Sequence, residues 1–418
     1  MKLTDYPAFV RFWVASTVSD FGTYITTIAI SVIVVLTLDG DSTDVGLVNA
    51  ARWLPYPVLG LVAGVWVDRH RRKPILVAGD FGRALILISI SVLGMVDWLT
   101  LPLMAGHIFA FGVLSLLSDA AFQSFVPQLV PRGLLVRANA RIEQSASVAQ
   151  TTGPALAGWV TQVLSAPTAL LIDAASFLIS GVVVLSVPSD ERSSNVPAAT
   201  SVGHQVREGL GWIYRHPRLG PLSLTTHLWF VCNSMFNVVF TVYALRERDL
   251  GAGGLGVVLA FAGVGAVLGT AITSRIGERI GAGWTIILGR AIYPLAFALI
   301  VASGATPEGS WVGFAVIAAG QFLIGLGLGI EGAQEMGYYQ AVTPDRLMGR
   351  MNATRRSINR AMIVVGAPLG GAVAAEIGTR PTMAISAGGM LLVAALLTAS
   401  GVRGARMDEQ LSEEEASA

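Results

Sequence analysis

Residues 131–158 read PRGLLVRANARIEQSASVAQTTGPALAG, and residues 344–371 read PDRLMGRMNATRRSINRAMIVVGAPLGG. The two stretches lie 213 residues apart and are identical at eight of their 28 positions. A repeat with so long an offset predicts a chain built from two duplicated halves. The shared residues are Pro131, Leu134, Arg137, Asn139, Ala140, Gly153, Leu156 and Gly158 in the first copy, and Pro344, Leu347, Arg350, Asn352, Ala353, Gly366, Leu369 and Gly371 in the second.

Two shorter correspondences extend the repeat beyond these stretches. Gly82-Arg83-Ala84 recurs as Gly289-Arg290-Ala291, and Asp20 aligns with Asn233 at the same 213-residue offset. The duplication therefore involves most of each half.

The composition predicts a membrane protein, because 53% of the 418 residues are hydrophobic and only 13% are charged. Twelve apolar stretches of about 20 residues or more are long enough to cross a hydrocarbon core of roughly 30 Å as helices. They are too long and too continuously apolar for the strands of a membrane barrel. We therefore predict an all-α membrane protein with twelve transmembrane helices in two pseudo-symmetric six-helix halves. The stretches are residues 9–37, 46–67, 75–96, 101–122, 138–164, 167–187, 219–244, 253–274, 284–304, 311–336, 352–376 and 381–402.

The polar segments predict the domain boundaries and the orientation. We expect one bundle at 1–187, a cytoplasmic linker with an amphipathic helix at 188–218, a second bundle at 219–404, and a disordered cytoplasmic tail at 405–418. Of the 28 Lys and Arg residues, 22 fall at the termini and in alternate connections on one side of the predicted bundle. The positive-inside rule then places both termini in the cytoplasm.

Several classes of chemistry are not expected. The net charge is +1, which gives no reason to expect a nucleic-acid partner. Cys232 is the only cysteine, which excludes disulfides and a thiolate metal cluster. The only lysines are Lys2 and Lys73, and neither belongs to a phosphate-binding loop, so we expect no ATP site. We also expect no cofactor and no metal, and the chain is not predicted to be an enzyme.

A short connection between the second and third predicted helices combines an acid with a basic cluster. One interpretation is a cytoplasmic loop whose aspartate partly neutralises its arginines. The alternative is that the loop resembles the signature of the major facilitator superfamily, in which glycine is followed after three residues by Asp-Arg and then by basic residues. Arg71 stands where that family usually has glycine. The residues of the motif are Gly64, Asp68, Arg69, Arg72 and Lys73.

Further motifs make the chain, over about residues 5–405, similar to the branch of that superfamily that holds enterobactin-type siderophore exporters and macrolide efflux proteins. They are the arginine-rich loop, residues 131–140, the DAASF sequence at 173–177, and EGLGWIYRHP at 208–217. The resemblance implies a secondary transporter whose two halves move about a central cavity. It also implies that Asp68 latches onto the start of the helix at 352–376, near Arg355, Arg356 and Arg360.

Glycine and proline recur together in the fifth and eleventh predicted helices. Small residues let helices approach closely and proline removes a backbone hydrogen bond, so both segments are predicted to form tight, bendable seams. The element in the fifth helix also resembles one associated with antiporters, which favours export, although ordinary close packing explains it almost as well. The residues are Gly153, Pro154 and Gly158, with Gly366, Pro368 and Gly370.

Asp20 is the leading candidate for a proton carrier. It lies about eleven residues into the first helix, hence roughly 16 Å from its inner end and near the midplane. An ionisable group at that depth is costly unless it faces water or a partner. The alternative is a permanent structural pair with Arg52 of the second helix.

Two further pairs of opposite charge occupy corresponding helices nearer the cytoplasm. Arg83 with Asp119, and Arg290 with Glu331, are predicted to be ion pairs that stabilise each half or form inner-gate elements, with a proton relay as the alternative. Glu335 lies closer to the inner surface and is expected to be solvated.

If the resemblance holds, helices 1, 4, 7 and 10 line a central cavity. Aromatic and amide side chains there suit a bulky amphipathic ligand, with core packing as the competing explanation for each aromatic residue. His107 and His227 are lone histidines within spans that could titrate or could be neutral and hydrogen-bonded. The predicted cavity residues are Tyr24, Phe111, His227, Asn233, Phe236, Asn237 and Gln321.

These features together predict a monomeric transporter in a bacterial cytoplasmic membrane. We expect it to export a hydrophobic or amphipathic small molecule, such as a drug, a siderophore or another secondary metabolite, in exchange for protons. Proton-coupled uptake by the same fold is the nearer alternative. A membrane receptor or assembly protein that has kept the fold without transport is the other.

Overall fold

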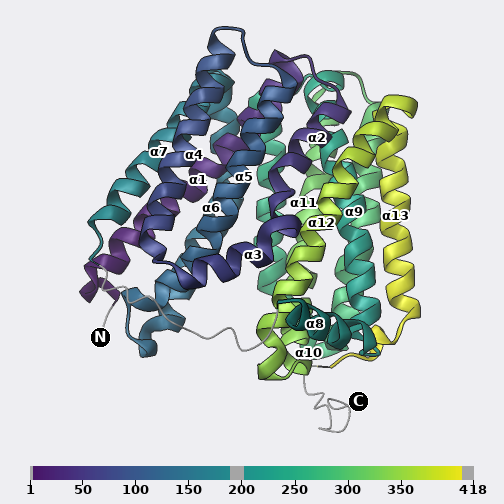
Figure 1. Cartoon of the computed structure of the whole chain (residues 1–418). Coiled ribbons are helices and arrows are strands. Elements are labelled where there is room, and N and C mark those ends of the chain that lie inside the picture. The colour runs from purple at the N-terminus through teal and green to yellow at the C-terminus, as the bar shows by residue number, and fades with distance from the viewer. Residues whose placement is uncertain (1–2, 189–201, 407–418) are drawn as a thin grey trace. The chain divides into compact units, whose positions relative to one another are not determined.

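The computed structural model describes residues 3–188 and 202–406, which are helical almost throughout and contain no strand (Figure 1). Lipid offers no hydrogen-bond partner to the backbone, so a chain of this composition satisfies its peptide groups within helices. The long helices are α1 (Pro7–Val32), α4 (Arg72–Met95), α5 (Leu101–Leu129), α6 (Leu135–Leu164), α7 (Ala166–Ser186), α9 (Leu219–Val242), α10 (Gly251–Ala302), α11 (Trp311–Val342), α12 (Asp345–Ile377) and α13 (Thr379–Ala399). The shorter ones are α2 (Ser42–Trp53), α3 (Pro55–Arg69) and α8 (Val202–Arg215).

Within the described part of the chain, nine helices are long and apolar enough to cross a membrane, against the twelve crossings predicted. Three features account for the difference. The helix α10 contains a break at Gly281, where φ is 84°, and it includes both predicted spans between 253 and 304. The predicted span 46–67 is divided into α2 and α3, each too short by itself. The helix α6 is long enough, but its sequence is too rich in polar residues.

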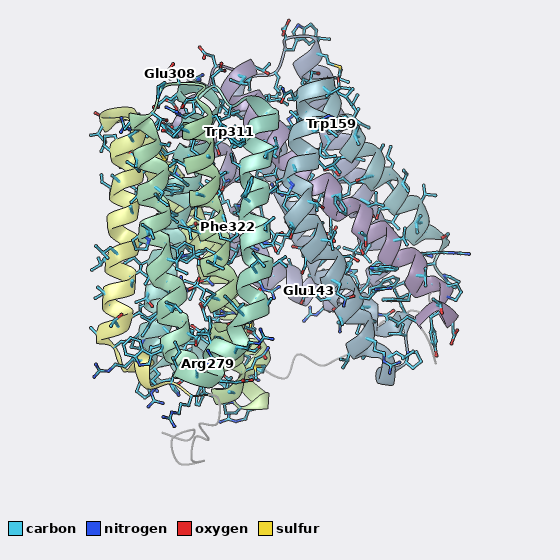
Figure 2. The ribbon with its side chains drawn as sticks, turned by 180° about the vertical axis from the view of Figure 1, so that it is seen from behind. Glu143, Trp159, Arg279, Glu308, Trp311 and Phe322 are labelled. Atoms are coloured by element: carbon cyan, nitrogen blue, oxygen red, sulfur yellow. The ribbon has the colours of Figure 1, made fainter. Side chains whose placement is uncertain are left out.

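Contacts within the chain divide it into two compact units. The first comprises Met1–Pro197, Ala244–Arg246 and Leu250–Ala260, and the second comprises Ala198–Tyr243, Glu247–Asp249 and Phe261–Ala418. In the first unit, α1 packs against α6 and α7, and α4 packs against α5 and α7. In the second, α9 packs against α12 and α13, and Figure 2 shows Arg279 at the opposite end of this unit from Glu308 and Trp311.

The first long helix of each unit ends in the same way. A π-helical turn follows α1 at Ile33–Thr37 and follows α9 at Tyr243–Glu247. Each turn leads into an aspartate with positive φ, 52° at Asp39 and 47° at Asp249. An aspartate tolerates this left-handed conformation better than most residues. The two units therefore share a detail of the backbone that no identity in the quoted repeat covers.

The expected amphipathic helix before the second bundle is α8, which lies on α12 within the second unit. Glu208 of α8 forms ion pairs with Arg350 and, at 3.5 Å, with Arg346. The indole of Trp212 donates to the Thr343 hydroxyl at 3.3 Å. Residues 189–201 of the predicted linker, and the predicted tail from residue 407, lie outside the described residues.

Candidate functional site

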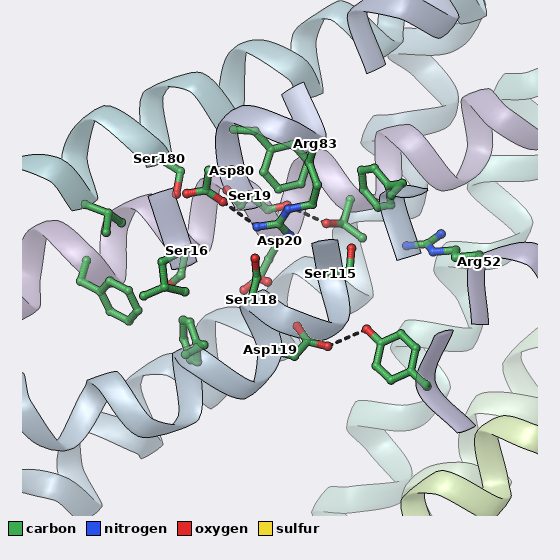
Figure 3. Close-up of a pocket in the computed structure, with 18 of the residues that line it drawn as sticks. Ser16, Ser19, Asp20, Arg52, Asp80, Arg83, Ser115, Ser118, Asp119 and Ser180 are labelled. Carbon is green, nitrogen blue, oxygen red and sulfur yellow. Dashed lines mark hydrogen bonds and ion pairs between the residues drawn. The ribbon is translucent and has the colours of Figure 1, made fainter. Parts of the chain in front are cut away.

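A polar cavity of about 290 Å³ lies inside the first unit, among α1, α2, α3, α4, α5 and α7 (Figure 3). Apolar side chains such as Phe12, Phe122 and Phe177 form part of its wall. The remainder of the wall is unusually polar for the interior of a membrane helix bundle, where each charge needs water or a partner. The polar lining residues are Ser16, Ser19, Asp20, Thr23, Arg52, Tyr56, Asp80, Arg83, Ser115, Ser118, Asp119 and Ser180.

Asp20 projects into this cavity from α1 and is half-buried. No hydrogen bond or ion pair engages its carboxyl group among the residues that the structure describes. The charged groups that act on it most strongly are two further acids, Glu143 and Asp119. Asp20 is therefore a half-buried acid beside a cavity, with no counter-charge bonded to it among the described residues.

Arg52 shares the cavity with Asp20 but does not form the ion pair considered from the sequence. Its guanidinium donates to the Thr27 hydroxyl at 3.0 Å. It also lies 5.5 Å from the Trp53 ring centroid and 5.9 Å from that of Phe111. A hydroxyl and two aromatic rings thus surround the cation, and no ion pair joins it to Asp20.

The predicted pairing of Arg83 with Asp119 is replaced by two other contacts. Arg83 binds Asp80, which lies three residues earlier on its own helix, at 2.6 Å. Asp119 instead accepts a hydrogen bond from the hydroxyl of Tyr56, at 2.7 Å. Arg83 binds Asp80 because residues three apart on a helix lie on the same face.

Asp80, Tyr56 and Asp173 are polar residues of this region that reasoning from the sequence did not select. Asp80 could have been found from its spacing to Arg83. Asp173 of α7 is fully buried and accepts hydrogen bonds from the hydroxyls of Thr26 and Ser176. Its carboxyl group occupies the space that a side chain at Gly22 would fill, so α1 and α7 are closely joined near Asp20.

The corresponding region of the second unit is a packed network of charges. Arg290 binds Glu331 at 2.5 Å, the pairing expected from the sequence, and also Glu335 at 2.7 Å. Arg355 binds Glu335 at 3.3 Å, and the hydroxyl of Tyr293 donates to Glu331 at 3.0 Å. The expectation that Glu335 is solvated is wrong, since its side chain is buried between the two arginines.

The predicted cavity residues fall in different surroundings. Phe111 lines the first unit's cavity, and the ring of Tyr24 packs against Gly153 of α6. Asn237 is exposed and donates to the carbonyl of Asn233 at 2.7 Å. Phe236 is fully buried, with its ring centroid 3.7 Å from that of Phe297. Its position favours the core-packing explanation.

Gln321 and the two histidines are also held within helix packing. Gln321 is 2% exposed. His227 is buried, with one ring nitrogen 2.9 Å from the Asn359 side-chain oxygen and the other 2.8 Å from the Tyr214 hydroxyl. His107 bonds to Ser89 and to the carbonyl of Leu103. Each ring therefore has two uncharged hydrogen-bond partners, so both histidines are hydrogen-bonded within the helix packing.

The motif loop is described except for its acid. Gly64 lies in α3 with open space around it, Arg69 is the last residue of that helix, and Arg72 is buried at the start of α4. Lys73 donates to the carbonyl of Val187 at 2.7 Å. The side chain of Asp68 lies outside the described residues, so the predicted latch stays a prediction.

The glycine seams make close backbone contacts, as small residues allow. A Cβ added to Gly158 would lie 2.5 Å from the Ala252 carbonyl and 2.8 Å from the Gly256 Cα. In the second unit, Cβ atoms on Gly366 and Gly370 would meet the α9 backbone, each at 2.6 Å. Pro154 and Pro368 both lie inside their helices.

Comparisons with known proteins show similarity to membrane transporters. A family model described as transmembrane secretion effector matches residues 4–417. The uncharacterized MFS-type transporter YfiS of Bacillus subtilis (strain 168) is 26% identical over 411 residues, covering 93% of this chain and 91% of that protein. Macrolide efflux protein A of Streptococcus pyogenes is 22% identical over 346 residues, covering 81% and 82%.

The fold is also found among solved structures. The crystal structure of the nucleoside transporter NupG matches with a TM-score of 0.74 at 14% identity, over 96% of this chain and 99% of that one. At this identity the likeness concerns the fold alone. The described residues of the present chain contain no group of three or more His, Cys, Asp or Glu side chains arranged to hold a metal ion.

Proposed function

Because this chain belongs to the transmembrane secretion effector family and is a membrane transporter of the major facilitator type, we propose that it exports an amphipathic small molecule in exchange for protons. The exporter would work by alternating access, in which a substrate site opens to one side of the membrane at a time. Each ligand would act only through its difference in affinity between the two states.

The observation that carries this proposal is the position of Asp20. It is a half-buried carboxyl group beside a polar cavity, and none of the described residues bonds to it. A carboxylate held in a permanent ion pair has little reason to exchange protons, whereas one that adjoins a polar cavity can load and release them. Arg52, which the sequence offered as a permanent partner, is bound elsewhere.

The proposed topology has twelve crossings in two halves of six. The helix α10 would cross twice, turning at Gly281, while α2 and α3 would together make one crossing and α6 another. The distribution of arginines supports cytoplasmic termini in a bacterial cytoplasmic membrane. We propose that the protein acts as a monomer.

Export as the direction is supported by the similarity to macrolide efflux protein A and by the Gly-Pro element at residues 153–154. Proton-coupled uptake is the second candidate, because the same fold serves both directions. Aromatic and amide residues such as Phe111, Asn233 and Asn237 are proposed substrate contacts. Asp68 is proposed to latch onto the start of α12.

The test uses erythromycin, a macrolide, as the probe in inside-out membrane vesicles. Acidifying the lumen should drive erythromycin into vesicles that hold the wild-type protein, and an uncoupler should abolish the accumulation. Asp20→Asn should reduce accumulation to the level of vesicles without the protein, while Glu308→Gln, which changes an exposed acid outside the cavity, should leave it intact. Full gradient-driven accumulation by Asp20→Asn would disprove the proton assignment.

A further inference from the structure

The hydrogen-bond ladder between α2 and α3 is interrupted directly against α5, although Leu54 between the two helices keeps helical φ and ψ of −54° and −36°. Pro55 begins α3 and has no backbone N–H with which to continue the hydrogen-bond ladder of α2. Gly112 of α5 faces the interruption, where an added Cβ would collide with the carbonyl oxygen of Arg52 and lie 3.2 Å from the Pro55 ring. The interruption is therefore seated on α5 by a close contact that only glycine allows.

Because α3 begins at this interruption, Tyr56 lies close to Asp119 of α5. Tyr56 lies one residue beyond Pro55, and Asp119 lies two helical turns beyond Gly112. The Tyr56 hydroxyl donates to Oδ2 of Asp119 at 2.7 Å, the dashed contact beside Asp119 in Figure 3. Any movement of α3 against α5 at the interruption would therefore change this hydrogen bond.

The cavity between Asp119 and Asp20 is suited to hold water. Asp119 is exposed and Asp20 is half-buried, so the two acids differ in their access to solvent. The hydroxyl oxygens of Ser19 and Ser118 line the cavity, are buried, and have no hydrogen-bond partner in the described part of the chain. Buried hydroxyls require partners, and a volume of about 290 Å³ has room for several waters at roughly 30 Å³ each.

We propose that Asp119 is a second proton-carrying carboxyl group, which passes protons between solvent and Asp20 through the cavity, and that Tyr56 controls this transfer as a positioning residue. The proposal rests on the proposed function, because it assumes that Asp20 exchanges protons. It adds a second acid, a route, and a reason why the transfer depends on conformation.

The transfer conserves atoms and charge. A proton from water binds a carboxylate oxygen of Asp119, a proton moves along hydrogen-bonded water to the carboxylate of Asp20, and Asp119 is left ionised. While Tyr56 is bound, Oδ2 of Asp119 accepts its hydrogen bond, so release of α3 would remove this donor from the carboxylate. The charged and titratable groups around Asp119 are Asp20 from α1, Arg52 from α2, Tyr56 from α3, Asp80 and Arg83 from α4, and Glu143 from α6 outside the cavity wall.

The first experiment asks whether the cavity contains water. Ser115→Cys, on the cavity wall, and Leu87→Cys, in the packed core, would each be made in a Cys232→Ser background. A charged, membrane-impermeant methanethiosulfonate reagent should label position 115 at least ten times faster than position 87. Equal and slow labelling would mean a dry cavity and would overturn the proposed route.

The second experiment separates the two acids by their effect on flux. In proteoliposomes with erythromycin, Asp119→Asn should slow gradient-driven transport at least tenfold, and should slow erythromycin exchange without a gradient much less. Asp119→Glu should restore gradient-driven transport. If Asp20→Asn fails but Asp119→Asn transports like the wild type, this inference is wrong while the proposed function stands. If Asp20→Asn transports normally, the proposed function itself is wrong.

The role of Tyr56 is tested by the pH profile of transport. Tyr56→Phe keeps the ring and removes only the donor to the Asp119 carboxylate, so protonation of that acid becomes easier and the profile should move toward higher pH. A structural role for Tyr56 would lower the rate equally at all pH values. An unchanged profile would therefore overturn the positioning role.

Discussion

The polar interiors of the two units come from corresponding helices but bury their charges in different ways. In the second unit, Arg290 and Arg355 are bonded to Glu331 and Glu335, and both carboxyl groups are buried. In the first, Arg83 binds a neighbour on its own helix, and a cavity of about 290 Å³ lies beside Asp20. A network of buried ion pairs loses a partner whenever one charge changes, whereas acids beside a cavity can change charge with water as the replacement. The two units thus differ in how their charges are bonded, and we expect those of the second to act as scaffold and those of the first to be available for chemistry.

Replacing the central arginine of each unit, Arg290 or Arg83, should give the largest difference in stability between the two units. Arg290→Met would leave Glu331 buried without its cation, and breaking a buried pair from one side costs about 3–5 kcal/mol. Arg83→Met should cost less, about 1.5–3 kcal/mol, because Asp80 adjoins the cavity. Thermal unfolding of the purified protein in detergent, followed by circular dichroism, would give the ranking. A larger loss for Arg83→Met would contradict the distinction between scaffold and site.

Gly153 and Gly366 occupy equivalent positions in the two seams. Replacing each by alanine should also destabilise the second unit more than the first, but by less than the arginine substitutions. An added Cβ on Gly366 would meet the backbone carbonyl of Val231 at 2.6 Å, whereas one on Gly153 would meet the ring of Tyr24 at 2.6 Å. A backbone atom cannot turn aside but a side chain can, so Gly366→Ala should cost about 1–3 kcal/mol and Gly153→Ala much less. Gly332→Ala, which has open space, is the control and should stabilise α11 slightly. Equal losses at Gly153 and Gly366 would mean that both seams are equally rigid.

The sequence predicted the helical membrane fold well. The length of an apolar segment, and the need of its backbone to form hydrogen bonds within a helix in lipid, both depend on that segment alone. It placed the start of α9 at residue 219 and the start of α5 at residue 101, where the structure has them. The interruption between α2 and α3 was not predicted, although Pro55 marks it. Whether a proline bends a helix or ends it depends on what packs beside it, and here Gly112 allows α5 to come close.

The site was predicted only in part, for a similar reason. Asp20 was selected from its depth in an apolar span, which is a property of the sequence alone. The partner of Arg83 was not, because Asp80 and Asp119 are both within plausible reach and only the packed structure decides between them. Asp173 and Tyr56 were missed since a buried acid bonded to hydroxyls, or a tyrosine beside a helix break, leaves no periodic signal.

The smallest change in stability should come from removing one tyrosine hydroxyl in each unit, that of Tyr293 or that of Tyr56. Tyr293 donates to Glu331 and both side chains are buried, so Tyr293→Phe should leave a buried acceptor without its donor and destabilise the protein by about 1 kcal/mol. Tyr56→Phe removes the equivalent bond to Asp119 beside the cavity, where water can donate instead, and should cost less than about 0.5 kcal/mol. The same detergent unfolding assay applies, with Tyr243→Phe as a reference for a buried tyrosine bonded to a neutral partner, Ser303. If Tyr56→Phe destabilises as much as Tyr293→Phe, the first unit's cavity does not exchange its hydrogen bonds with water. Its acids would then be scaffold like those of the second unit.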